Sequence, residues 1–335
     1  MDEVIGPAAG SLQRSKLSPP QASTEYLLRP QVEAALSAHP HARLVLFSAP
    51  AGFGKTTALM VLAERHREAG GAVAWVSLSA DDDDPVRFFQ QLIDALGRAL
   101  PGLGEDALGY LRNTMRVPVE AVMESLLAEM AQRSEPLLLV LDDLHLLQDP
   151  ELLAALNRLA KLAPASFTLA IGSRSQPALS LATLRAKGML LEFGADELRL
   201  NPEEVRSYLE RSGLQLEPDA LKALYSHTEG WMVGVHLASL WLRHHPQPAQ
   251  RMAELGADQT AVGDYLLRSV FEQLPQARQE QLLALGIAQQ LSGDLARQFA
   301  GRAEYQCLTA EKARVQRRQQ ADAEGGGLAA AGLGL

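Results

Sequence analysis

The chain has 335 residues, which is enough for two or three domains of ordinary size. Hydrophobic residues make up 47%, so a sizeable core can form, and the formal net charge of −9 disfavours a nucleic-acid-binding role, a locally basic patch aside. The single cysteine, Cys307, excludes an internal disulfide and indicates a reducing compartment. No apolar run reaches the ~20 residues that span a bilayer, and Asp2 and Glu3 are atypical of a signal peptide, so we expect a soluble, cytoplasmic protein.

Residues 1–25 are rich in Gly, Pro, Ser and Gln, which predicts a flexible N-terminal arm. The segment from Tyr26 to Leu36 is predicted to be helical, with Arg29 and Pro30 near its start. An apolar run at 43–48 follows and predicts the first buried strand.

The stretch SAPAGFGKTT at 48–57 is the most informative part of the chain. A Gly-rich turn leads from the strand into a helix that opens with Lys-Thr-Thr, which is the order of a phosphate-binding loop. Gly residues let successive backbone N–H groups point inward, and the start of the helix adds free N–H groups and a positive dipole end. We expect Lys55 to contact the β- and γ-phosphates of ATP and the Thr56 hydroxyl to bind Mg²⁺. The predicted phosphate-binding residues are Ala51, Gly52, Phe53, Gly54, Lys55, Thr56 and Thr57.

Two features near this loop leave alternatives open. The strict loop pattern has Gly where this chain has Ala49, and a strand-to-helix turn with a chance Lys-Thr pair is the alternative. The lead-in with Arg29 and Pro30 either lies against the base of the nucleotide or only covers the edge of the sheet.

Helix and strand patterns alternate after the loop, as in a parallel α/β sheet. The expected helices cover 56–69, 86–100, 119–132 and 151–162, and the expected strands cover 72–78, 137–142, 167–174 and 188–193. The acidic run Asp81 to Asp84 suggests either a metal site or a helix cap. Its spacing fits no calcium loop, and Asp84 directly before Pro85 favours the cap.

The second informative stretch is LLLVLDD at 137–143. A continuous apolar run of this length is typical of a central parallel strand that is buried on both faces. Two carboxylates at its C-terminal end lie where ligands bind in open α/β sheets. We expect the tip of this strand to be adjacent to the phosphate loop, with Asp142 in the Mg²⁺ shell and Asp143 orienting the attacking water.

Two further polar residues follow predicted strands. His145 either senses the γ-phosphate or makes a local hydrogen bond at a helix entry, and we favour the local bond. Arg174, at the tip of the strand that starts at Phe167, either faces solvent or contacts the γ-phosphate. We favour the phosphate contact because neighbouring strand ends converge on the same crevice.

From Asn201 the alternation stops and helical patterns take over, with Asn201 as the expected cap of the first helix. Trp231 opens a long apolar helix, and we expect its side chain to fill a core between helices rather than to bind a ligand. Residues 260–300 hold two more amphipathic helices. After residue 301 the chain becomes basic and then Gly/Ala/Leu-rich, without core-forming periodicity.

Short motifs that occur in order along the chain carry a family resemblance. They are Lys16-Leu17, Pro19-Pro20, Leu28-Arg29-Pro30, SAPAGFGKTT at 48–57, WVSL at 75–78, DDPVRFF at 83–89, LVLDDLHLL at 139–147, SR at 173–174, TEGW at 228–231 and LP at 274–275. With these motifs the chain resembles the N-terminal part of the large ATP-dependent LuxR-type transcriptional regulators, the family of the maltose-regulon activator. That family lies within the signal-transduction ATPases with numerous domains (STAND).

The resemblance implies an α/β fold: a P-loop NTPase with a parallel sheet flanked by helices, a small helical domain, and a partial winged-helix domain. It implies phosphate and Mg²⁺ binding by Gly54, Lys55 and Thr56. It also implies Asp142 as the magnesium-shell acid, Asp143 as the catalytic acid and Arg174 as the sensor arginine. In such regulators ATP and an inducer favour a self-associating form that activates transcription, and hydrolysis to ADP resets it.

We therefore expect five parts in the chain. They are a flexible arm (1–25), a P-loop ATPase domain (26–200), a helical domain (201–255), a partial winged-helix domain (256–301) and a disordered or non-native tail (302–335). The family continues with inducer-binding repeats and a DNA-reading helix-turn-helix, which do not fit into the tail. We expect a truncated chain, for which a frameshift would be one cause. We expect it to contact DNA only through a C-terminal domain that it lacks, and to contact no membrane.

Three functions compete. The first, which we favour, is an ATP-binding switch module of a transcription regulator with slow hydrolysis. The second is a free-standing P-loop enzyme such as a small-molecule kinase, which needs an acceptor-binding lid that the sequence does not reveal. The third is an oligomerisation module that binds nucleotide without hydrolysing it.

Overall fold

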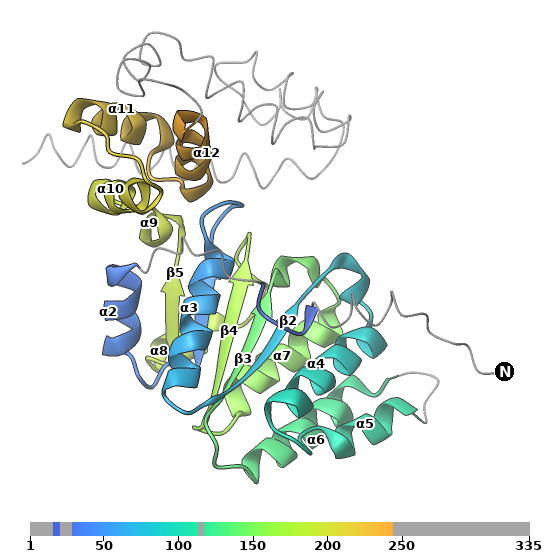
Figure 1. The fold of residues 1–335 in the computed structure, drawn as a ribbon. Helices are drawn as coiled ribbons and strands as arrows, with labels where there is room; N and C mark the ends of the chain where they lie inside the picture. The colour runs from blue at the N-terminus through green and yellow to red at the C-terminus, as the bar shows by residue number, and fades with distance from the viewer. Residues whose placement is uncertain (1–15, 21–28, 113–116, 244–335) are drawn as a thin grey trace, which may run out of the picture. The chain divides into compact units, whose positions relative to one another are not determined.

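The computed structural model describes residues 16–20, 29–112 and 117–243 (Figure 1). The chain divides into two units, Met1–Gly256 and Ala257–Leu335, and every described residue belongs to the first unit. The expected winged-helix domain, its two helices and the expected tail therefore lie outside the described residues, as does most of the expected arm.

Five parallel strands form one sheet in the part of the chain that the structure describes. They are β1 (Leu44–Ser48), β2 (Ala72–Ser77), β3 (Leu137–Asp142), β4 (Phe167–Ser173) and β5 (Leu190–Phe193). The strand order is β2-β3-β4-β1-β5, and all paired neighbours are parallel, which confirms the predicted fold class. β4 lies between β1 and β3, so these two strands are not neighbours in the sheet. The tip of β3 nevertheless reaches the loop after β1, as expected, because Thr56 Oγ1 donates to Asp142 Oδ2 at 2.7 Å.

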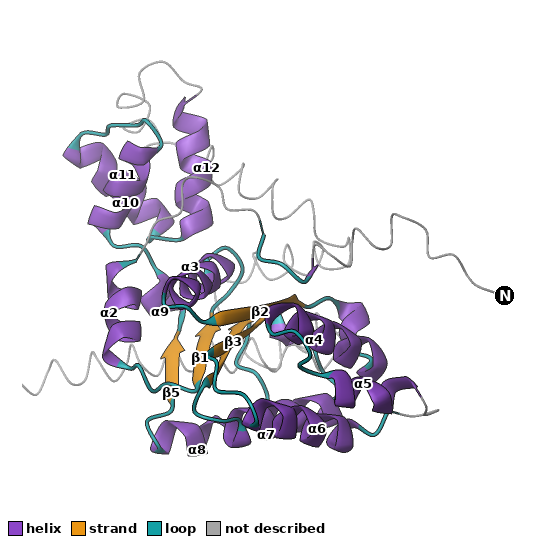
Figure 2. Ribbon diagram, turned by 60° about the horizontal axis from the view of Figure 1, so that its bottom comes forward, coloured by secondary structure: helices purple, strands orange, loops and turns teal. Residues whose placement is uncertain are grey.

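Helices cover both faces of the sheet (Figure 2). They are α2 (Pro30–Ala38), α3 (Lys55–Glu68), α4 (Pro85–Ala99), α5 (Glu105–Arg112), α6 (Val119–Ala131), α7 (Pro150–Leu162), α8 (Leu181–Ala186) and α9 (Ala195–Leu198). The patterns of α5, α8 and α9 were not predicted. None of the described helices is long and apolar enough to cross a membrane.

The middle strand β3 shows how the two faces are filled, because successive side chains of a strand point to opposite faces. Leu137, Leu139 and Leu141 pack in one buried cluster with α4, α6 and α7. Leu138 and Val140 pack in the other buried cluster, with α2 and α3. A strand buried on both sides needs a continuous apolar sequence, and LLLVL supplies it.

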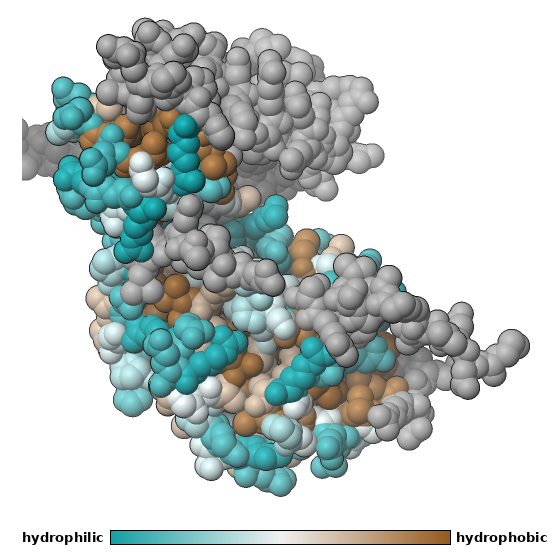
Figure 3. Space-filling view, viewed as in Figure 1, coloured by the Kyte–Doolittle hydropathy of each residue, from teal (hydrophilic) through white to brown (hydrophobic). Residues whose placement is uncertain are grey.

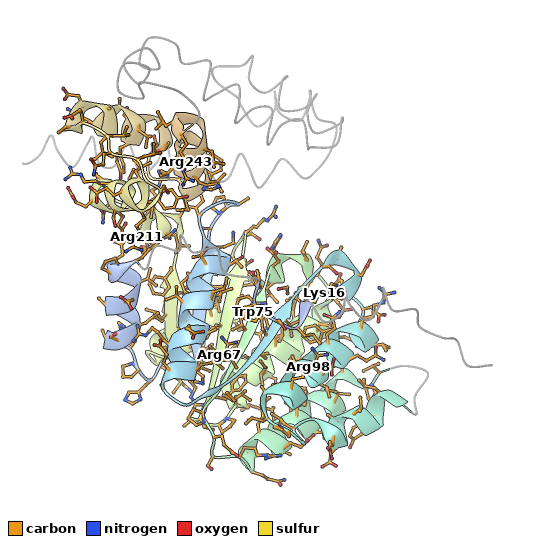
Figure 4. All side chains as sticks on the ribbon, in the orientation of Figure 1. Lys16, Arg67, Trp75, Arg98, Arg211 and Arg243 are labelled. Atoms are coloured by element: carbon orange, nitrogen blue, oxygen red, sulfur yellow. The ribbon has the colours of Figure 1, made fainter. Side chains whose placement is uncertain are left out.

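The acidic run before α4 is structural. Asp84 accepts a hydrogen bond from the backbone N–H of Arg87 at 3.0 Å, which confirms the predicted N-cap. Asp82 is buried and accepts from Lys16 Nζ at 2.9 Å, and Lys16 lies on the same side of the molecule as α4 (Figure 4). The neighbouring Leu17 is buried in the core, so residues 16–17 are anchored to the domain.

Three helices follow the sheet: α10 (Pro202–Arg211), α11 (Pro218–Thr228) and α12 (Met232–Arg243). The predicted cap of α10 is confirmed, because Asn201 Oδ1 accepts from the N–H of Glu204 at 2.9 Å, and Glu204 Oε2 accepts from the N–H of Asn201 at 2.8 Å. Hydrophobic residues gather over α11 and α12 on the face shown in Figure 3. The buried residues of α11 and α12 include Leu224, Val235 and Leu242.

Candidate phosphate-binding site

The loop at residues 49–54 connects β1 to α3 in a shape that requires glycine. Gly52 and Gly54 both have φ of 79°, in the left-handed region that glycine adopts without steric cost. A Cβ at Gly54 would lie 2.8 Å from Arg29 Nη2, and a Cβ at Gly52 would lie 2.6 Å from Trp231 Nε1. The two glycines therefore provide the turn and also the space for side chains that cover it.

The first turn of α3 faces this loop. Its N-cap is Gly54, so no side chain caps the helix start. The first N–H groups of a helix lack partners within the helix, and they carry the positive end of its dipole. This arrangement is able to bind an anion with backbone groups alone.

Lys55 is the first residue of α3, and only 7% of it is exposed. Its Nζ donates to the carbonyl oxygen of Pro50 at 2.9 Å, within the same loop. Burial lowers the pKa of Lys55, Asp143 and Asp142 oppose that shift, and the positive charge of Arg174 adds to it. A bound anion would favour the charged ammonium form of Lys55, so the position of this lysine suits a negatively charged ligand.

Thr56 joins the loop to β3. Its Oγ1 donates a hydrogen bond to Asp142 Oδ2 at 2.7 Å, and the backbone N–H of Asp143 donates to Asp142 Oδ1 at 3.0 Å. Asp142 is only 3% exposed, and burial raises the pKa of its carboxyl above the ordinary range, although the hydrogen bond from Thr56 opposes the rise. A cation beside this carboxylate would relieve the cost of burying its charge.

Gly172 on β4 makes room for that carboxylate. A Cβ at this position would lie 2.4 Å from Asp142 Oδ1 and 2.9 Å from Leu59 Cδ1. Sequence reasoning missed this residue, because the contact crosses from one strand to the next and leaves no signal within the strand.

Asp143 follows β3 in a strained conformation. Its φ is 58°, which is uncommon for a residue other than glycine and is found at functional sites. Its carboxylate Oδ1 lies 3.7 Å from Nδ1 of His145, in the 3₁₀ turn Leu144–Leu146. Burial lowers the pKa of His145, although Asp143 opposes the shift. Its buried Nδ1 makes no hydrogen bond in the described part of the chain, so the local bond that we favoured is not seen at this atom.

Arg174 directly follows β4, the strand between β1 and β3. Its side chain is exposed, and its charge acts on the pKa values of both Lys55 and His145. The inserted strand therefore brings a further charged residue to the end of the sheet where the loop and Asp142 meet.

The remaining predicted residues lie on the side of the loop that faces α2 and α12. Arg29 is buried, and its Nη2 donates to the carbonyl oxygen of Phe53 at 2.8 Å. Thr57 lines a small cavity beside Arg29, whereas Pro30 is exposed in the first turn of α2. Ala51 is exposed, and its carbonyl oxygen accepts a hydrogen bond from Trp231.

Trp231 makes a contact with the loop that the sequence did not predict. It packs against the buried cluster that includes residues of α2 and α3, as expected of a core side chain, but its Nε1 also donates to Ala51 O at 3.1 Å. The backbone N–H of Val233 also donates to Gly52 O, at 3.2 Å. The start of α12 therefore packs on the loop itself, and a glycine followed by tryptophan 180 residues after the loop gives no signal of this contact.

The donor set fits magnesium. Thr56 and Asp142 offer a hydroxyl and a carboxylate oxygen, and Mg²⁺ is typically held by one or two protein oxygens together with phosphates and water. Among the described residues no group of three or more His, Cys, Asp or Glu is arranged to hold a metal ion. The site therefore suits a metal that arrives with its phosphates.

The chain is similar to known proteins both in sequence and in fold. The family model described as the AAA domain matches residues 38–179. The HTH-type transcriptional regulator MalT of Cronobacter sakazakii (strain ATCC BAA-894) is 30% identical over 292 residues, which are 86% of this chain and 32% of that protein. The solved structure of a STAND protein with a tetratricopeptide repeat sensor from Pyrococcus horikoshii is 17% identical. The structural match covers 86% of this chain and 38% of the Pyrococcus horikoshii chain, with a TM-score of 0.53.

The strand order and the matching domain define the class of the fold, which is that of a P-loop NTPase. The particular proteins that the chain resembles are the MalT-type regulators, in their ATPase portion, as the motifs indicated. The chain spans about a third of the length of the curated relative that it matches.

Proposed function

We propose that this chain is the nucleotide-binding switch module of a transcriptional regulator, which binds ATP with Mg²⁺ and hydrolyses it slowly. The observation that carries the proposal is the 2.7 Å hydrogen bond from Thr56 to Asp142, which joins the Gly-rich loop to the end of β3. These are the two groups that would share one magnesium ion in such a site.

We assign roles to the loop and to the charged and hydroxyl residues around it. The loop N–H groups and Lys55 bind the phosphates, and Lys55 exchanges the Pro50 carbonyl for a phosphate oxygen. Thr56 and Asp142 hold Mg²⁺, which would neutralise charge on the phosphates when bound. Asp143 orients the attacking water, and Arg174 contacts the γ-phosphate and responds to its loss.

The state of the nucleotide is the signal in this proposal. The start of α12 contacts the loop through Trp231 and Val233, so a change at the loop reaches the helices that follow the sheet. We infer that the ATP form self-associates and the ADP form does not. In a regulator of this kind DNA is read by a domain beyond this segment.

The proposal is tested by titrating the protein with a fluorescent ATP analogue in the presence of Mg²⁺. Lys55→Ala removes a charge-assisted phosphate contact, so we expect affinity to fall by about 1.5–3 kcal/mol, or roughly 10- to 150-fold. Lys161→Ala, at an exposed position of α7, removes an equal charge and should leave affinity unchanged. Equal affinities of wild type and Lys55→Ala would reject the site.

A further inference from the structure

A groove crosses the surface of α6 and α7, two helices that lie side by side (Figure 2). Its larger part has a volume of about 980 Å³, and a smaller part of about 550 Å³ lies beside the start of α4. Both parts are lined by Val117 and Glu151, so they form one groove. The helices α4, α6 and α7 pack in one buried cluster and α3 packs in the other, so the groove and the start of α3 belong to opposite faces of the sheet.

The floor of the groove is apolar and mostly made of small side chains. It includes Val117, Val119, Ala121, Met123, Ala154 and Ala155. The smaller part adds Val86, which is 39% exposed and is one of three large hydrophobic residues exposed in the described part of the chain. Small side chains let another chain approach closely, and a concave apolar surface in water is stabilised when apolar side chains cover it.

The rims of the groove carry charge of one sign. Among the described residues that line it, five are acidic and only Arg158 is basic, which gives a formal charge of −4. The acidic residues are Asp84, Glu120, Glu124, Asp149 and Glu151.

Local bonds occupy these carboxylates without neutralising the groove. Arg158 donates to Glu120 at 2.6 Å and also to Glu124, so two negative charges share one positive charge. Asp84 and Asp149 accept hydrogen bonds from backbone N–H groups at the starts of α4 and α7. Each helix dipole offsets roughly half a charge there. A negative field therefore remains along the groove.

This field decides between kinds of ligand. Nucleic acids, nucleotides and anionic lipids are repelled by it. A single metal ion does not fit either, because no three His, Cys, Asp or Glu side chains of the described residues are arranged to hold one. Carboxylates that are spread along an apolar floor instead suit several cations that are held at intervals on one apolar body.

The spacing on α6 indicates what kind of body this is. Glu120 and Glu124 are four residues apart on the helix, so their side chains start about 6 Å from each other on one face. Lysine or arginine residues four apart on another helix have the same spacing. Their long stems can also cover apolar surface while the charged ends reach the rims.

We propose that this groove binds a cationic amphipathic helix of a partner protein. The apolar face of that helix lies on the floor, and its basic side chains pair with the acidic rims, which is a common mode of peptide recognition. The inference does not depend on the nucleotide site, since none of the described residues that we assign to the phosphate site lines the groove.

The test uses the full chain and a fluorescent synthetic peptide of leucine, alanine and lysine. The peptide is about 18 residues long, so that it can form a helix, and its lysines lie one turn apart beside a leucine face. A reference peptide has glutamate in place of every lysine. Fluorescence anisotropy should show the lysine peptide binding about 10-fold or more tightly than the reference. Raising the ionic strength from about 0.05 M to about 0.5 M should weaken it, because exposed charges are screened.

Two variants and a matched control test the location. Ala154→Trp fills the floor at an exposed position of α7, so the fold should be kept while the lysine peptide binds about 10-fold or more weakly. Glu120→Gln/Glu124→Gln should weaken it by about 2- to 25-fold, since each exposed ion pair contributes a factor of about 1.4 to 5. Glu64→Gln/Glu68→Gln removes two exposed glutamates with the same spacing from α3 and should change nothing.

The results that would overturn the proposal are distinct. Equal binding of the two peptides, or no binding of the lysine peptide, rejects a cationic partner. Undiminished binding to Ala154→Trp places the peptide elsewhere on the surface. A wild-type dimer in sedimentation that Ala154→Trp dissociates shows that a second copy of the chain occupies the groove instead. ATP affinity should be the same in wild type and Ala154→Trp, and a protein that binds no ATP rejects the proposed function while leaving the groove untouched.

Discussion

The two ends of the candidate site are built in different ways. The phosphate end uses backbone groups and the short side chains of Thr56 and Asp142, which are fixed at the loop and at the end of a buried strand. The other end uses long side chains, Arg29 and Trp231, from elements far away in the sequence. In the switch that we propose, the chemistry would belong to the rigid sheet end, and the response to nucleotide would belong to the contacts of Arg29 and Trp231 with the loop.

The largest effect should come from the rigid end, at Asp143. Asp143→Asn removes the carboxylate that we propose to orient the attacking water, so we expect turnover to fall by about 100-fold or more while ATP affinity is kept. Asparagine tolerates the left-handed backbone of this position, so the fold should be retained. Phosphate release at saturating ATP measures the change, and Asp106→Asn at an exposed position of α5 is the control. Unaltered turnover would mean that this carboxylate does not take part in hydrolysis.

A second substitution tests how tightly the sheet end is packed. Gly172→Ala inserts a methyl group 2.4 Å from Asp142 Oδ1, and we expect a loss of about 1–3 kcal/mol in the free energy of unfolding. Mg²⁺-dependent ATP binding should weaken with it, because the carboxylate must move. Chemical denaturation and nucleotide titration measure both effects.

The control for that variant is Gly109→Ala, in α5, where an added Cβ meets nothing within 4 Å. This change should stabilise the helix by about 0.5–1 kcal/mol. If both alanine variants were equally stable, the close packing around Asp142 would be disproved.

The smallest effect should come from the other end. Trp231→Phe removes the N–H that donates to Ala51 O, which we expect to cost about 0.5–1.5 kcal/mol and to loosen α12 on the loop. Faster amide hydrogen exchange in peptides that contain residues 49–54 would report it. Trp75→Phe loses a comparable bond, to Ser77 at 2.8 Å, inside β2 and should leave exchange in the loop unchanged. Identical amide exchange of the loop in wild type and Trp231→Phe would contradict the idea that this bond holds α12 on the loop.

The contrast between the two ends of the site also explains which features could be predicted from the sequence. The strand β3, the Gly-rich loop and the caps at Asp84 and Asn201 are local patterns, and the structure confirms them. The position of β4 between β1 and β3 was not predictable, because several apolar runs fit the centre of a sheet equally well.

Contacts between distant segments were missed for a similar reason. The need for Gly172 arises from a side chain on the neighbouring strand, and the place of Trp231 depends on how the helices fold back on the loop. Periodicity and spacing report how one element is buried, and they do not report which element buries it.

The bond between Lys55 and the Pro50 carbonyl has a consequence for selectivity among anions. A ligand must compete with this internal acceptor, so a small, weakly charged ion gains little by displacing it. A polyphosphate that also occupies the N–H groups of the loop offsets the exchange through several contacts at once. If the loop is the phosphate site that we propose, a triphosphate should therefore compete with the Pro50 carbonyl better than a single phosphate does.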